Sequence, residues 1–353
     1  MKSVPLRRFP VLSLVFLIQA LSATQAAEPA KPAFTRPAAQ EWANVTNDVG
    51  GEKWGYAGVC LLAAVPDSAT VIAGVSEQGL WSTSDTGATW KKLGADDKEP
   101  IKHRPHRIVF DPKDPATFWV SGCYGAGIFK TADGGKSFVR LGNLNHVDSV
   151  AVDFSDPERK TLLAGLHEQA QSLQLSKDGG KSWQKIGDRL PEDSNFSTDP
   201  IIVDTKTFLI NTAGWKQKAK PGIYRSEDGG STWTQVSPSG PSGVPLVASD
   251  GAIYWQAVWG GGLIRSTDKG KTWAAPAKGV KNNVIELPDG RLAGLSDGQL
   301  VLSADAGATW TKFGPPLPFK GSGVVYSPKG KCFYAWQSSE KKNPQAIVRL
   351  NVE

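Results

Sequence analysis

Apolar residues along this chain come in short runs that are separated by turn-forming residues. In the first complete unit, residues 59–65, 70–75 and 80–83 have the composition of strands, and Trp90 begins a fourth. No stretch of the sequence keeps a sustained 3.6-residue apolar period between capping residues, so helix is not expected. Units of four short antiparallel strands that recur along a chain predict an all-β fold of the β-propeller type.

An eight-residue phrase follows the third strand of six successive units. In each copy a hydroxyl residue lies two positions before an Asp, a Gly two after it, a second hydroxyl four after it and an aromatic five after it. The carboxylate can accept hydrogen bonds from nearby N–H groups, and the Gly permits a left-handed backbone angle. Binding and catalytic sites on repeat folds use different residues in different repeats. We therefore predict a structural role for the six aspartates: Asp85, Asp133, Asp178, Asp228, Asp268 and Asp305.

The phrase resembles the Asp box, or BNR repeat, of sialidases, xyloglucanases, sortilin-type receptors and photosystem II assembly factors. This resemblance implies a β-propeller in which each box joins the third and fourth strands of a blade, away from the usual active-site face. Because these families have unrelated activities, the resemblance leaves the activity open.

Strand-forming sequence continues after the sixth box. The Asp residues of successive boxes are 37 to 50 positions apart, and residues 323–326, 332–336 and 346–352 supply three more strands. The strand around Trp42 can supply the fourth, which would remove an exposed sheet edge. We therefore expect one seven-bladed propeller domain over residues 41–353, with the last blade closed by the N-terminal strand.

The N-terminal segment has the features of a secretory signal peptide over residues 1–26. Basic residues come first, and the apolar run over residues 11–21 is too short to span a bilayer. Residues 27–40 are rich in Pro and Ala and are expected to form a linker. We expect a secreted or periplasmic protein without a membrane span.

Charge and cysteine content exclude some functions. The net charge is +6, but the basic residues are scattered and form no stripe with interleaved aromatics, so nucleic acid is not expected as a partner. Cys60, Cys123 and Cys332 are too far apart for a metal-binding motif and cannot all pair. They are either buried thiols or include one bridge between Cys60 and Cys332. No cofactor or metal is expected.

Polar residues gather in the segments that we expect at one face, around the mouth of the central channel. All four histidines of the chain fall there: His103, His106, His146 and His167. Near them in sequence are four further polar residues: Arg107, Tyr124, Asp148 and Glu168. One interpretation is a set of solvated loop side chains without a catalytic role.

Two chemistries suit this group if it is functional. One is proton abstraction beside the carboxylate of a uronic acid, as in the polysaccharide lyases with propeller folds that it resembles. His106, His146 or His167 would then be the base. Tyr124 would be the acid, and Arg107 would neutralise the carboxylate. The other is metal binding by the histidines and a carboxylate, although their spacing matches no common motif.

Hydrolysis by two carboxylates is a third possibility, the one implied by a xyloglucanase resemblance. It needs an acid and a base about 6 to 10 Å apart, and the channel-facing loops offer too many carboxylates to choose a pair. The resemblance also implies two propellers with a cleft between them, whereas this chain has sequence for one. A resemblance to sialidases would imply an Arg-Ile-Pro phrase before the first box, and this chain has none there, so a sialidase activity is disfavoured.

Aromatic residues beside glycines are candidates for stacking on sugar rings. Trp54, Tyr56, Trp215 and Trp259 fall in segments expected at the channel face. Flat rings at such positions suit sugar binding, but they also suit packing between blades.

Two functions of different classes remain. The first is an exported, glycosidase-like BNR propeller that acts on or binds a polysaccharide at the channel mouth, as a glycoside hydrolase or polysaccharide lyase if it is an enzyme. The second is a non-catalytic scaffold or assembly factor that binds a protein, like the sortilin-type and photosystem-assembly propellers. A monomer is expected in either case.

Overall fold

The computed structural model describes residues 41–352, except residues 126, 193, 195–198, 213–220, 242, 258–260, 276 and 340. The described residues all belong to one compact unit of the chain, Phe34–Glu353. The predicted signal peptide (residues 1–26) and linker (residues 27–40) lie outside the described residues, so the account below concerns this unit.

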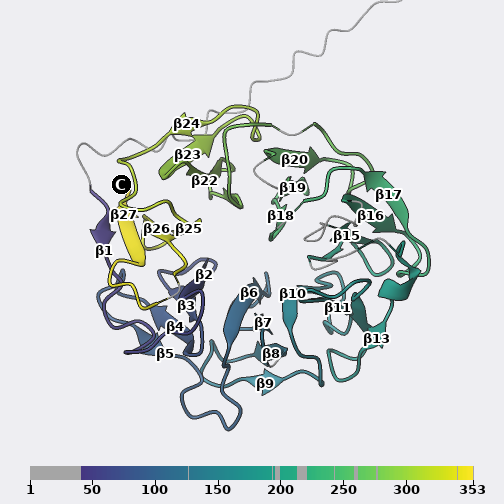
Figure 1. Cartoon of the computed structure of the whole chain (residues 1–353), viewed down its shortest axis with the longest axis horizontal. Coiled ribbons are helices and arrows are strands. Elements are labelled where there is room, and N and C mark those ends of the chain that lie inside the picture. The colour runs from purple at the N-terminus through teal and green to yellow at the C-terminus, as the bar shows by residue number, and fades with distance from the viewer. Residues whose placement is uncertain are drawn as a thin grey trace, which may run out of the picture. The chain divides into compact units, whose positions relative to one another are not determined.

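Seven antiparallel sheets follow one another around a ring in this unit (Figure 1). Among the described residues, six sheets have four strands and one has three. In blades 1 to 6 the strand order within each sheet is the order along the chain. In blades 1, 2, 3 and 5 the first strand is seen to lie toward the centre of the ring (Figure 1). The prediction of an all-β, seven-bladed propeller is therefore confirmed.

The strands of each blade have the following bounds. Blade 1 consists of β2 (Val59–Ala64), β3 (Val71–Val75), β4 (Gly79–Thr83) and β5 (Lys91–Lys92). Blade 2 consists of β6 (Arg104–Phe110), β7 (Phe118–Cys123), β8 (Ile128–Thr131) and β9 (Val139–Arg140). Blade 3 consists of β10 (Val147–Val152), β11 (Leu162–Leu166), β12 (Gln174–Ser176) and β13 (Gln184–Lys185). Blade 4 consists of β14 (Ile201–Ile202), β15 (Phe208–Thr212), β16 (Gly222–Ser226) and β17 (Thr234–Ser237).

The remaining blades are shorter or are built from both ends of the described chain. Blade 5 consists of β18 (Leu246–Val247), β19 (Ile253–Gln256) and β20 (Leu263–Ser266). Blade 6 consists of β21 (Ile285–Glu286), β22 (Leu292–Ser296), β23 (Gln299–Ser303) and β24 (Thr311–Lys312). Blade 7 consists of β25 (Gly323–Ser327), β26 (Cys332–Trp336), β27 (Ile347–Asn351) and β1 (Ala43–Asn44).

The sheet of blade 7 has β1 as its outermost strand. Ala43 of β1 lies opposite Arg349 of β27. Just beyond β1, the hydroxyl oxygen of Thr46 accepts a hydrogen bond from the backbone N–H of Ile347 at 2.9 Å. Segments at opposite ends of the described chain therefore share one sheet.

The apolar core is divided into layers between neighbouring blades. Trp119 of β7 packs with Val150 and Leu162 of blade 3, and Leu163 of blade 3 packs with Phe208 of blade 4. The second strands, such as β3, β7 and β15, are buried on both faces, because every blade lies between two others. This leaves the innermost strands and their loops free to form a site.

One short helical turn, η1 (Gly187–Arg189), is the only helix among the described residues. No helix in this part of the chain has the length and apolar character needed to cross a membrane.

The three cysteines carry free thiols, so the possible bridge between Cys60 and Cys332 is wrong. Cys60 lies on the innermost strand of blade 1, where its thiol donates a hydrogen bond to the carbonyl of Gly58 at 3.3 Å. Cys332 is completely buried in the core layer between blades 7 and 1. Cys60 and Cys332 therefore lie in different environments and are not bonded to each other.

The six repeated turns use their carboxylates internally. In the fourth copy, Asp228 accepts hydrogen bonds from the hydroxyl and backbone N–H of Thr232 at 2.7 and 2.9 Å and from the hydroxyl of Ser226 at 2.8 Å. Gly230 has a φ of 87° and donates its N–H to the same Ser226 hydroxyl. The other five copies repeat these contacts. Each carboxylate therefore closes its own turn.

These contacts make the stability of the turns depend on pH. The hydroxyl and N–H of Thr272 lower the pKa of Asp268 to about 2. Because the pKa is lower in the folded state, Asp268 stabilises the fold above the ordinary aspartate pKa, and this contribution is lost as the pH falls toward 2. We expect Asp268→Asn to lower the midpoint of thermal unfolding at pH 7 and to have a smaller effect at pH 3.

Thermal unfolding followed by circular dichroism at both pH values measures this difference. Asp67→Asn is the matched control, since Asp67 lies in an exposed turn with a φ of 50° that Asn also tolerates. An equal loss for Asp268→Asn at pH 7 and pH 3 would contradict the role assigned to the carboxylate.

Candidate functional site

The candidate site lies where strands of blades 2 and 3 end. Tyr124 directly follows β7, and His167 directly follows β11. Asp148 lies on β10, the innermost strand of blade 3 (Figure 1). The loops between second and third strands thus bring residues of two blades to one place.

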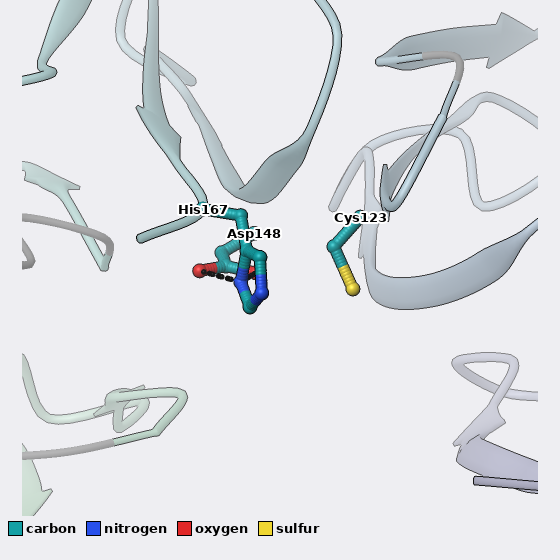
Figure 2. Close-up of side chains that lie close together, drawn as sticks. All are labelled: Cys123, Asp148 and His167. Atoms are coloured by element: carbon teal, nitrogen blue, oxygen red, sulfur yellow. Dashed lines mark hydrogen bonds and ion pairs between the residues drawn. The ribbon is translucent and has the colours of Figure 1, made fainter. Parts of the chain in front are cut away.

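His167 is held by Asp148. Nδ1 of His167 is 2.8 Å from Oδ1 and 3.0 Å from Oδ2 of Asp148, which is only 7% exposed (Figure 2). The hydrogen bond from Nδ1–H to the carboxylate raises the pKa of His167 although burial opposes it, and the charges of Asp148 and Glu168 add to the rise. The bond also fixes the tautomer, so neutral His167 has its lone pair on Nε2.

Nε2 of His167 is the atom available for chemistry. It is buried and has no hydrogen-bond partner, and Oε1 of Glu168 is 3.6 Å away. A buried nitrogen that can accept a proton and is not otherwise engaged suits a general base.

Tyr124 covers His167 edge-on. Its ring lies 4.7 Å from the His167 ring at an interplanar angle of 73°, and 6.5 Å from the ring of His146. The ring is 45% exposed. Burial, followed by the charge of Glu168, raises the pKa of Tyr124, so the phenol remains protonated and can donate a proton or hydrogen bond.

The backbone around these side chains is strained. Tyr124, His146 and Glu168 have φ values of 60°, 52° and 51°, and His103 has 70°. A left-handed angle at a residue other than Gly costs about 1 to 2 kcal/mol. Hydrogen bonds from the N–H of His146 to Gly125 and from the N–H of His167 to His146 hold these loops in place. Positive φ values at residues other than Gly also occur in turns elsewhere in the described chain, for example at Asp67, Lys269 and Asp297, so they do not by themselves mark a functional site.

Cys123 is the third member of a close cluster with Asp148 and His167. Their ligand atoms lie within 4.8 Å of one another, and sulfur, nitrogen and carboxylate oxygen are all zinc ligands. However, burial raises the pKa of Cys123 to about 12, and Asp148 is already bonded to Nδ1 of His167. A metal would have to displace the thiol proton and compete with that bond, so the geometry favours acid–base chemistry.

His106 is not in a loop as predicted, because β6 already begins at Arg104, whereas Arg107 lies on this strand as expected. Nδ1 of His106 is 2.7 Å from the carbonyl oxygen of Asp148. Arg107 donates a hydrogen bond from Nη1 to the hydroxyl of Ser149 at 2.6 Å. Burial lowers the pKa of Arg107, while the charge of Asp199 acts in the opposite direction.

Both residues line a central cavity of about 380 Å³. A β-bulge in β6 between Pro105 and Arg107 allows two consecutive side chains to reach it. The cavity is otherwise lined by innermost strands of blades 1, 5, 6 and 7 and by Trp336. His106 and Arg107 thus belong to the cavity wall, whereas Tyr124, Asp148, His167 and Glu168 form one contact group.

The residues predicted to stack on sugar rings differ in their exposure to solvent. Trp54 is buried, packs in the core layer between blades 7 and 1, and donates its indole N–H to the carbonyl of Val49 at 3.1 Å. Trp54 therefore packs between blades, the alternative that the sequence also allowed, and is not an exposed ring for sugar stacking. Tyr56 is 62% exposed. Trp215 and Trp259 lie outside the described residues.

Replacing Asp148 should change the titration of His167. We expect Asp148→Asn to lower the pKa of His167, because the neutral amide no longer stabilises the imidazolium while burial still disfavours it. NMR titration of the His167 ring protons measures the shift. Glu168→Gln is the control and should lower the pKa less, since Glu168 acts by charge alone. An unchanged titration in Asp148→Asn would contradict the assigned hydrogen bond.

Comparison with known proteins supports the fold and gives distant relatives. No protein-family model matches the chain. Over 71% of its length the chain is 25% identical to a xyloglucanase from Paenibacillus sp, and the match covers 24% of that protein. Over 36% of its length it is 38% identical to the dispase autolysis-inducing protein of Streptomyces mobaraensis, of which 33% is covered. The chain therefore spans about a quarter to a third of the length of these curated relatives.

Two solved structures show the same architecture. A structure of YCF48 bound to D1 peptide has a TM-score of 0.57 and 14% identity, with 90% of this chain and 100% of that chain covered. The GH74 xyloglucanase from Xanthomonas campestris has a TM-score of 0.54 and 17% identity, with 87% of this chain and 55% of that chain covered. The chain is a seven-bladed β-propeller with xyloglucanases among its sequence relatives.

Proposed function

We propose that this protein is a glycosidase-like propeller that acts on or binds a polysaccharide at the loops around His167. The observation that carries this proposal is the pairing of His167 with Asp148, which leaves Nε2 without a hydrogen-bond partner beside the exposed ring of Tyr124. The xyloglucanase relatives favour a polysaccharide as the substrate.

The side chains present suit proton transfer by a histidine and a tyrosine. His167 accepts a proton at Nε2, and the imidazolium that results is stabilised by Asp148. Tyr124, whose ring is 45% exposed and lies 4.7 Å from the His167 ring, supplies a phenol O–H. Asp148 is engaged with His167, so it does not serve as one of two free carboxylates for hydrolysis.

Export is part of the same proposal. Residues 1–26 have the pattern of a signal peptide, and one structurally similar protein is described as the extracellular domain of a putative one-component system from B. thetaiotaomicron. Six self-bonded turns with the spacing of the Asp box support assignment to the BNR-repeat propellers. We propose a secreted or periplasmic monomer.

A screen of the purified protein tests this function. The protein is incubated with neutral polysaccharides, including xyloglucan, and with uronate-containing polysaccharides. New reducing ends report either hydrolysis or elimination, and ultraviolet absorbance of unsaturated ends reports elimination alone. Retention on immobilised glycans reports binding without turnover. No product and no retention across the panel would reject the proposal.

A second candidate is a non-catalytic propeller that binds a protein or peptide. The observation in its favour is that the chain covers the whole of the YCF48 chain, whereas it covers about half of the xyloglucanase structure. This candidate would be supported if the folded protein gives no product and no binding in the glycan screen but binds members of a peptide library.

A further inference from the structure

Arg104 lies at the edge of the candidate site, although the sequence pattern did not single it out as an anion-binding residue. It is the first residue of β6 and lies opposite Cys123 of β7, the residue before Tyr124. Its guanidinium carbon is 6.0 Å from the centre of the exposed Tyr56 ring. Burial raises the pKa of Cys60, Cys123 and Tyr124, the hydrogen bond to Asp148 raises that of His167, and the charge of Arg104 opposes each rise. Arg104 also makes a hydrogen bond to the Cys60 side chain.

Arg104 has no carboxylate partner among the described residues. The ion pairs of other arginines in this part of the chain join Arg159 to Asp111, Arg225 to Glu227 and Arg291 to Asp289. Arg104 is half-buried, and its Nε is buried without a hydrogen-bond partner. A guanidinium that has lost part of its water without gaining a counter-ion is unfavourable, and an anionic ligand would offset that cost.

The neighbouring rings suit a sugar. Tyr56 and Tyr124 are 62% and 45% exposed, so both can offer a ring face or edge to a pyranose. A guanidinium can bind a carboxylate through two parallel N–H bonds, which fixes the orientation of the sugar that carries it. Arg107, which the sequence suggested for this role, is instead bonded to Ser149 in the wall of the central cavity.

We infer that Arg104 is the anion-binding residue of the site and that the ligand is a uronate-containing glycan, whose carboxylate Arg104 holds between Tyr56 and Tyr124. This inference rests on the proposed function and narrows its substrate class. Under this inference Glu168 does not bind the anion, because its own carboxylate lies beside His167.

Calorimetric titration with matched trisaccharides tests the inference. The probes are trimers of galacturonate, glucuronate and mannuronate, each paired with the neutral trimer of galactose, glucose or mannose. We expect at least one uronate trimer to bind about tenfold or more tightly than its neutral counterpart, a difference of about 1.4 kcal/mol. Added salt should weaken that binding, because the attraction is between charges.

Variants locate the effect on one side chain. Arg104→Gln should remove the preference for the uronate trimer, and Arg104→Lys should restore part of it, since Lys keeps the charge without the two-bond geometry. Arg265→Gln is the matched control: Arg265 also lies over a tyrosine ring, at 5.5 Å from Tyr254, and has a buried Nε without a partner, but it lies on β20 of blade 5. Thermal unfolding shows whether each variant is folded.

The outcomes separate the inference from the proposed function. Equal binding of neutral and uronate trimers, unchanged in Arg104→Gln, would overturn the inference and leave a neutral polysaccharide as the ligand. Binding of no trimer together with a silent polysaccharide screen would reject both. If the protein binds peptides through their free C-terminal carboxylate and binds none of the trimers, the inference would also be overturned, and the peptide-binding candidate would be favoured.

Discussion

Replacing His167 by glutamine should lower turnover of the polysaccharide identified by the screen by about 10²- to 10⁴-fold, the usual contribution of a general acid or base. The reason is that Nε2 of His167 is the buried acceptor beside Tyr124, and a glutamine amide cannot take up a proton there. Initial rates at saturating substrate measure the loss, and circular dichroism shows whether the variant is folded.

His146→Gln is the matched control for this prediction. The His146 side chain is exposed and its ring lies 6.5 Å from Tyr124, farther than that of His167. We expect turnover in this variant to fall less than about tenfold, because no carboxylate among the described residues is hydrogen-bonded to the His146 ring. A large loss in His146→Gln with full turnover in His167→Gln would show that the wrong histidine has been assigned.

The pH dependence of turnover follows from the same assignment. As a base, His167 must be neutral, and its pKa lies above the ordinary value of 6.5 because of the hydrogen bond to Asp148. The groups that act on it are Asp148 and Glu168, which raise the pKa, and Arg104, which lowers it. Turnover should therefore rise with pH through this raised pKa, and Asp148→Asn should move the rise to lower pH.

Replacing Asp111 by alanine should lower the free energy of unfolding by about 3 to 5 kcal/mol, the cost of leaving one partner of a buried ion pair alone. Nε and Nη2 of Arg159 bond the two carboxylate oxygens of Asp111 at 2.8 and 3.1 Å, and both side chains are 9% exposed. The pair joins the loop after β6 in blade 2 to the loop before β11 in blade 3. Urea unfolding followed by fluorescence measures the change.

The double variant Asp111→Ala, Arg159→Met tests the cause. If the loss comes from an unpaired guanidinium, the double variant should be more stable than Asp111→Ala alone. Glu158→Gln is the surface control: its partner Lys160 is 53% exposed, so the unfolding midpoint should hardly change. A double variant less stable than Asp111→Ala would contradict this account.

The fold could be predicted from sequence because its signals are local. Each turn is formed by eight consecutive residues. Its hydroxyl, Asp, Gly and aromatic residues therefore contact one another in the structure and are also close together in the sequence, as the hydrogen bonds of Asp228 show. The strands between the turns follow from apolar runs such as residues 59–65. The number of blades then follows from counting.

The site was only partly predictable because its contacts join different blades. The sequence indicated that Tyr124, Asp148 and His167 share one face, but not that Asp148 bonds to His167 or that Cys123 lies beside them. The bulge in β6 turns Arg107 into the central cavity and leaves Arg104 at the site, and no residue type in that segment reveals a bulge. Trp54 shows the same limit, since an indole beside glycines suits both packing and recognition.

The pairing of β1 with β27 has a consequence for biosynthesis. Thr46 and Ile347, which bond each other beside that pair, are 301 positions apart. A ribosome makes the chain from its amino end, so β1 leaves the exit tunnel long before its neighbour exists. Blade 7 therefore assembles after translation of the last strand, and until then the nascent chain carries an unsatisfied strand that other polypeptides can bind.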